Sequence, residues 1–109
     1  MKDEQLIDIE RSVLGSMLCS VEVCKAGIRL FDEKDFKVPG HLVVFQSLRT
    51  LSASGQPIDC VTVREFLRKQ GSLDLVGGSG AVAELIQFGS DIAPLEYYAK
   101  RLKEAFDRP

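Results

Sequence analysis

Residues 56–78 read Gln-Pro-Ile-Asp-Cys-Val-Thr-Val-Arg-Glu-Phe-Leu-Arg-Lys-Gln-Gly-Ser-Leu-Asp-Leu-Val-Gly-Gly, and this stretch decides how the chain folds. Asp59 is placed to cap a helix, because its carboxylate can accept hydrogen bonds from the free N–H groups of the first turn. Thr62 and Glu65 form a competing capping box, so two starts one turn apart are open. Gly71 is placed to end the helix in the left-handed conformation. The stretch therefore predicts one well-delimited helix.

One face of this helix is apolar and carries Val63, Phe66 and Leu67. Ser72 can begin a further short helix, and Gly77-Gly78 then releases the chain. Ser79 is placed to cap the helix that follows, in which Val82, Leu85, Ile86 and Phe88 fall on the apolar side. The residues to which we assign structural roles are Asp59, Phe66, Gly77 and Gly78.

Hydrophobic spacing extends the helical pattern over the rest of the chain. It predicts helices over 3–19, after Ser20, from Pro39, and from Asp91 or the residues just before Pro94. Gly15-Ser16 lies inside the first of these, where glycine costs about 1 kcal/mol relative to alanine, so we expect a close helix neighbour there. No stretch alternates with a period of two, so no sheet is expected. The prediction is an all-α compact orthogonal bundle of about six helices, with residues 1–109 as a single domain.

Composition limits the classes of function. The chain has 109 residues, 45% of them hydrophobic and 28% charged, which suffices for one hydrophobic core. Its net charge of −2 argues against nucleic-acid binding, which requires clustered lysine and arginine. The polar N-terminus lacks the apolar segment of a signal peptide, and no run approaches the length of a membrane span. Three cysteines without framework spacing indicate reduced thiols in a cytoplasmic protein.

No catalytic or metal-binding motif stands out. Gly77-Gly78-Ser79-Gly80 precedes a helix, but no lysine follows as a phosphate-binding loop requires, so we interpret it as a flexible turn. Cys24 has no local group that would activate a thiol nucleophile, and His41, the only histidine, is expected to cap or pack. Zinc is not expected because no Cys-x-x-Cys pair is present. Cys19 and Cys60 are expected to be small core residues.

Two further clusters have ordinary structural interpretations. The acids Asp32, Glu33 and Asp35 fit a solvated turn, with Phe36 directed inward. Tyr97 and Tyr98 should diverge by about 100° on a helix, so one is expected in the core and the other on the surface. An exposed tyrosine suits an interface.

Short motifs in a fixed order carry a family resemblance. They are Ile9-Glu10, Ser12-Val13-Leu14-Gly15-Ser16, Asp35-Phe36, Pro39, His41, Pro57-Ile58-Asp59, Val61-Thr62, Leu67, Gly71-Ser72-Leu73, Gly77-Gly78, Ala83-Glu84-Leu85 and Glu96-Tyr97-Tyr98-Ala99-Lys100. No single motif is strongly specific, but the ordered set, over roughly residues 7–105, resembles the N-terminal domain of bacterial and phage replicative DNA helicases, the DnaB family.

The resemblance implies a non-catalytic domain that acts through its surface. In that family the domain forms the collar of a hexameric ring, as a trimer of dimers, and docks DnaG-type primase or a helicase loader. A RecA-like motor, absent from these residues, supplies ATP hydrolysis with magnesium and contacts DNA. For this chain the resemblance implies a truncated domain of a longer protein, without cofactor, metal, nucleic-acid or membrane contact of its own. It implies the cytoplasm of a bacterial cell or of a phage-infected host.

Departures from the family pattern mark the expected partner surface. Ala81-Val82 stands where the family usually has Tyr-Leu, and residues 90–94 replace a Pro-Ser-Ala-Ala-Asn-like loop. We expect the interface between Gly78 and Pro94 and at the start of the last helix. Its candidate residues are Glu84, Phe88, Asp91, Glu96 and Tyr97. The alternative is a free-standing adaptor or the helicase-binding domain of a primase, and a thiol-dependent enzyme is a more distant third.

Overall fold

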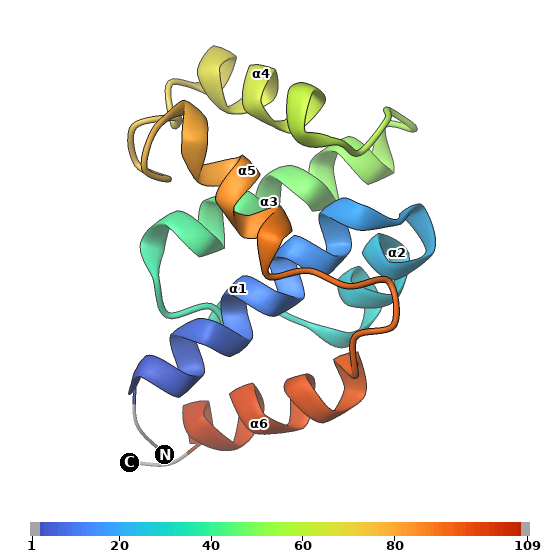
Figure 1. Ribbon diagram of the computed structural model, residues 1–109, viewed down its shortest axis with the longest axis vertical. Coiled ribbons are helices and arrows are strands. Elements are labelled where there is room, and N and C mark those ends of the chain that lie inside the picture. The colour runs from blue at the N-terminus through green and yellow to red at the C-terminus, as the bar shows by residue number, and fades with distance from the viewer. Residues whose placement is uncertain (1–2, 108–109) are drawn as a thin grey trace.

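In the computed structural model, the described residues form six α-helices and one 3₁₀ turn (Figure 1). The structure describes the backbone of residues 3–107 and the side chains of residues 4–105. The elements are α1 (Asp3–Cys19), α2 (Val21–Leu30), η1 (Glu33–Asp35), α3 (Pro39–Ala53), α4 (Cys60–Gln70), α5 (Ser79–Gln87) and α6 (Leu95–Asp107). No strand occurs within the described backbone, which confirms the predicted all-α class. None of the described helices is both long and apolar enough to cross a membrane.

Helix α1 is the centre of the bundle. It packs against α2, α3, α5 and α6, and Figure 1 shows it running through the middle of the molecule, between α6 at one end and α4 at the other. Helix α4 is attached through α3 and α5. The largest fully buried side chains come mainly from α1 and α3 and include Leu14, Met17, Phe45, Leu48 and Leu51. Hydrophobic spacing in the helix that begins at Pro39 predicts an apolar stripe of Val44, Phe45, Leu48 and Leu51, and all four are buried in the core.

Helices α1 and α5 cross in close contact, as Gly15-Ser16 predicted. A Cβ on Gly15 would lie 1.9 Å from the carbonyl oxygen of Leu85, and one on Gly89 would lie 2.3 Å from the carbonyl carbon of Gly15. The hydroxyl of the buried Ser16 accepts a hydrogen bond from the backbone N–H of Ser90 at 3.0 Å. Two glycines and one serine thus hold the end of α5 against α1.

Several predicted helix ends are confirmed. Ser20 caps α2 through the N–H of Val23, and Asp59 caps α4 through the N–H of Thr62 at 2.8 Å. The Asp59 start therefore prevails over the Thr62–Glu65 box. Gly71 ends α4 with φ of 75°, a left-handed conformation that favours glycine. Pro39 occupies the first turn of α3.

The segment between α4 and α5 differs from the prediction. The expected short helix after Ser72 is a run of turns over residues 73–77, because the bond from the N–H of Val76 to the carbonyl of Ser72 is not continued. Ser79 does not cap α5. It is the first helical residue, and Gly78 takes the capping position with φ of 92°. Gly78 has no side chain with which to cap, so this helix starts without a side-chain cap.

The acidic turn is only partly solvated, which corrects the prediction for Asp35. Its carboxylate is buried, and Oδ2 accepts hydrogen bonds from the N–H of Asp32 at 2.8 Å and from Nζ of Lys103 at 2.7 Å. The other oxygen, Oδ1, is buried without a hydrogen-bond partner among the described residues. Burial lowers the pKa of Lys103, but its hydrogen bond to Asp35 and the charge of Asp35 outweigh this and raise it. Asp35 thus ties η1 to α6.

The cysteines also differ from the prediction. Cys19 is exposed and Cys60 is half-buried, so neither is the core residue expected. Cys24 takes that place, and burial raises the pKa of its thiol to about 11. A thiol with so high a pKa is almost entirely protonated at neutral pH and is a poor nucleophile. Hydrophobic spacing also predicts Phe106 on the apolar face of the last helix, but its side chain lies outside the described residues.

Candidate partner-binding site

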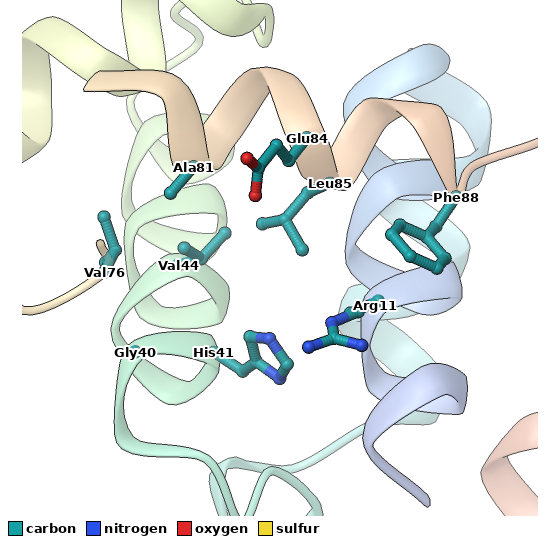
Figure 2. A pocket seen from close by; sticks show the side chains of 9 residues that line it. All are labelled: Arg11, Gly40, His41, Val44, Val76, Ala81, Glu84, Leu85 and Phe88. Carbon is teal, nitrogen blue, oxygen red and sulfur yellow. The ribbon is translucent and has the colours of Figure 1, made fainter. Parts of the chain in front are cut away.

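A cavity of about 390 Å³ opens where α1, α3 and α5 meet (Figure 2). Figure 2 shows side chains from all three helices converging on it. The lining residues are Arg11 from α1, Gly40, His41 and Val44 from α3, Val76 from the turn before α5, and Ala81, Glu84, Leu85 and Phe88 from α5 and its C-terminal end. The mixture of apolar walls with three ionisable groups is typical of a recognition site.

The α1 side of the cavity is formed by Arg11. Its guanidinium contacts the carboxylate of Asp8 at 3.0 Å and lies over the ring of Phe88, 5.5 Å from the centroid. Both groups of the Arg11–Asp8 pair are substantially exposed, so the pair contributes little to stability by itself. The cation–π contact holds Phe88 against α1.

The α3 side of the cavity rests on a fully buried carboxylate. Glu10 of α1 accepts hydrogen bonds from the N–H of Lys37 at 3.0 Å and of Val38 at 3.4 Å, and its Oε1 lies 2.9 Å from Nδ1 of His41. Val38 is the capping residue of α3 and provides no side-chain cap. A carboxylate from another helix therefore holds the start of α3 and fixes the His41 ring.

Sequence reasoning missed this role of Glu10. It assigned His41 a capping or packing role, and the structure shows a contact to Glu10 that orients the ring. The available signal was a charged residue on an otherwise apolar helical face, between Ile9 and Val13, which are both buried. Such a residue must find donors when buried, but the pattern does not say where they lie in the chain.

The α5 side of the cavity carries two of the predicted interface residues. Glu84 is exposed and its carboxylate points from α5 into the cavity (Figure 2). Phe88 was placed with the apolar side of the helix, but 45% of it is exposed, at the rim beside Arg11. It lies past the last helical residue, Gln87, where the chain turns away from the core. Phe88 is thus an exposed aromatic residue at the edge of the cavity.

The other three predicted interface residues lie outside the lining of this cavity. Asp91 and Glu96 are exposed, and Tyr97 is 52% exposed with the guanidinium of Arg101 over its ring at 5.3 Å. Tyr98 is half-buried against the core, so the predicted division between the two tyrosines is confirmed. Residues 88–97 also include Ile92, which is 87% exposed. Residues 88–97, which we call the 88–97 segment, therefore expose three large apolar side chains, those of Phe88, Ile92 and Tyr97.

The residues with assigned structural roles lie around α4. Asp59 and Gly71 delimit the helix, and Leu67 is fully buried, whereas Phe66 is only partly buried against the core. Gly77 and Gly78 both have positive φ, which accounts for the paired glycines at that turn. Among the described side chains, no group of three or more histidine, cysteine or acidic residues is arranged to hold a metal ion.

Comparison with known proteins identifies the family. The sequence profile of the DnaB-like helicase N terminal domain matches residues 2–104. The replicative DNA helicase DnaB of Treponema pallidum is 33% identical over 99 residues, which are 91% of this chain and 23% of that protein. The replicative DNA helicase DnaB of Leifsonia xyli is 32% identical over 95 residues, or 87% of this chain and 21% of that protein. The chain thus spans less than a quarter of these relatives.

A solved structure agrees with the sequence comparisons. The N-terminal domain of the DnaB helicase from Mycobacterium tuberculosis superposes with a TM-score of 0.84 at 32% identity, covering 92% of this chain and 71% of that one. The agreement extends over nearly the whole described fold. On the sequence profile, the related helicases and the shared architecture, this chain belongs to the DnaB-like helicase N-terminal domain family.

Proposed function

We propose that this domain is the non-catalytic collar domain of a hexameric replicative DNA helicase, in which it mediates subunit assembly and docks a primase or helicase loader. The family match over residues 2–104 carries the proposal. ATP and magnesium would be bound by a RecA-like motor elsewhere in the parent protein, in the cytoplasm of a bacterium or a phage-infected host. Residues 1–109 would fold as one unit of that protein.

The surface supports a role in protein recognition. The exposed apolar side chains of the 88–97 segment lie among the acids Glu84, Asp91 and Glu96. Exposed aromatic residues with apolar neighbours are typical of protein interfaces, whereas a surface rich in acids repels nucleic acid. The departures at Ala81-Val82 and at residues 90–94 fall in the same part of the fold.

Titration calorimetry with the C-terminal domain of the cognate DnaG-type primase, and separately with the cognate loader, tests the docking role. We expect binding by one of them, and charge reversal at Glu84, Asp91 or Glu96 should weaken it without loss of helicity by circular dichroism. Self-association of the isolated domain should be weak, with an interface below about 1,200 Å². Wild-type binding by these variants, together with loss of binding from exposed changes on α1, would place the interface elsewhere.

The alternative of a primase domain or free-standing adaptor has less support. The curated relatives described above are helicases, and the family profile and the solved structure are those of a helicase N-terminal domain. The thiol-enzyme alternative is opposed by the buried, protonated thiol of Cys24. A Walker motif in the reading frame downstream of Pro109 would identify the helicase parent directly.

A further inference from the structure

The charges that line the cavity between α1, α3 and α5 are not balanced. Arg11 is paired with Asp8 at 3.0 Å, and Nδ1 of His41 is engaged by the buried Glu10 at 2.9 Å. Glu84 has no ion pair or hydrogen bond among the described side chains, although its carboxylate points into the cavity (Figure 2). The unmatched charge of this cavity is therefore negative.

The chain around Glu84 strengthens this bias. Residues 70–99 contain four acids, Asp74, Glu84, Asp91 and Glu96, and no lysine, arginine or histidine. Arg11, which approaches this stretch from α1, is engaged by Asp8 and Phe88, and Arg101 of α6 lies over Tyr97 and donates to its hydroxyl. The face that carries the exposed Phe88 and Ile92 thus offers a partner mainly negative charge.

The cavity also has the form that a long basic side chain requires. Lysine and arginine bury their methylene stems against apolar groups and direct the charged end to an acceptor. Val76, Ala81 and Leu85 provide apolar wall, and Glu84 provides the acceptor. When the His41 ring is neutral, its Nδ1 carries the proton bound to Glu10, so Nε2 is left as a second acceptor on a ring that lines the cavity.

We propose that this cavity receives an arginine or lysine side chain from a partner helix whose apolar residues cover Phe88. The inference rests on the proposed docking role and names the chemistry of the docked segment: an amphipathic helix with a basic residue on its apolar edge. Glu84 pairs with the charged end, and the exposed face of Phe88 packs against the stem or a neighbouring apolar residue.

Designed peptides test this without the natural partner. Three helical peptides share one leucine and alanine pattern and differ at a single central residue, which is arginine, glutamine or glutamate. Their affinity for the wild-type domain is measured by NMR titration, with the backbone signals of residues 81–88 as the local readout. We expect the arginine peptide to bind most tightly, and Glu84→Gln to weaken it about fivefold or more.

The matched control is Glu65→Gln, which removes an exposed glutamate of α4 outside the cavity lining and should leave all three affinities unchanged. Glu84→Lys should reverse the order, so that the glutamate peptide binds most tightly. The proposal is overturned if the wild-type domain prefers the glutamate peptide, which would make Arg11 and His41 the recognition groups. Equal affinities, or binding by none of the peptides, would also overturn it. Failure of primase and loader to bind, with these peptide results intact, would count against the proposed function alone.

Discussion

Helices α3 and α4 both begin after an extended residue, but the carboxylates that hold their first turns come from very different places. For α4 the carboxylate is on Asp59, immediately before the helix, and it accepts the N–H of Thr62. For α3 it is on Glu10, 28 residues before Val38, and it accepts the N–H groups of Lys37 and Val38. The first is an exposed local cap, and the second is a buried contact between helices.

The difference in burial sets the expected energies. An exposed cap can be replaced by water when it is lost, so its removal costs about 1 kcal/mol. Removing a fully buried carboxylate deprives several donors of one shared acceptor and also leaves a space inside the fold. Glu10 should therefore stabilise the fold far more than Asp59, although both hold the start of a helix.

The largest effect is expected for Glu10→Ala. The variant removes the acceptor that the backbone N–H groups of Lys37 and Val38 and the ring of His41 share at the buried Glu10. We expect a loss of about 3–5 kcal/mol in the free energy of unfolding, the range for breaking a buried pair from one side. Urea unfolding followed by circular dichroism measures it, with Glu65→Ala on the exposed face of α4 as the control. A loss no larger than that of Asp59→Ala would show that water reaches the site.

The next effect is expected for Gly15→Ala, a second contact between distant parts of the chain. The added methyl group would lie 1.9 Å from the carbonyl oxygen of Leu85, so α1 and α5 must separate. Overpacking of this kind costs about 1–3 kcal/mol or more. Gly80→Ala is the matched control: it is also helical, has open space around its Cβ, and should be neutral or slightly stabilising. Equal thermal midpoints for the two variants would contradict the close crossing.

A smaller effect is expected for Asp59→Ala, which should lose about 1 kcal/mol. The hydrogen bond from the Thr62 backbone N–H lowers the pKa of Asp59 below its usual value. Because the folded pKa is the lower one, this stabilisation is present above the unfolded pKa and is lost as the pH falls through the folded value. Wild type and variant should therefore differ at pH 7 and converge in acid. A difference that does not change with pH would exclude the charged cap as its cause.

The three positions changed in these variants also show which features of the fold the sequence predicts and which it does not. Four residues that start or end helices were identified correctly from the sequence, because each acts within four residues of its helix end. They are Ser20, Pro39, Asp59 and Gly71. Gly15-Ser16 predicted a close neighbour but could not name α5. Glu10 and Asp35 were missed as buried groups because their partners include residues 27 and 68 positions away. Position relative to a helix end is local information, and burial of a charge is not.

The candidate site shows the same limit. Departures from the family pattern, short loops and uneven apolar exposure predicted Glu84 and Phe88 on the partner surface, and the structure brings both to one cavity. The contributions of Arg11 and His41 depend on how α1, α3 and α5 meet, which helical periodicity does not specify. Asp91, Glu96 and Tyr97 lie outside this cavity, so the predicted set divides between the cavity and the 88–97 segment.

The smallest effect comes from moving the remote carboxylate of α3 to a local position. His41 is the third residue of α3, from which a glutamate can reach back to the N–H of the capping residue, as in a capping box. The chain already uses this arrangement in η1, where Asp35 accepts the N–H of Asp32. In the Glu10→Ala background, His41→Glu should therefore recover about 0.5–1 kcal/mol through the N–H of Val38. In the wild-type background the same change sets a second carboxylate beside the buried Glu10 and should destabilise. Urea unfolding of the wild type, the two single variants and the double variant measures this change of sign between the two backgrounds. A substitution that destabilises equally in both backgrounds would mean that a local acid cannot take over the role of Glu10.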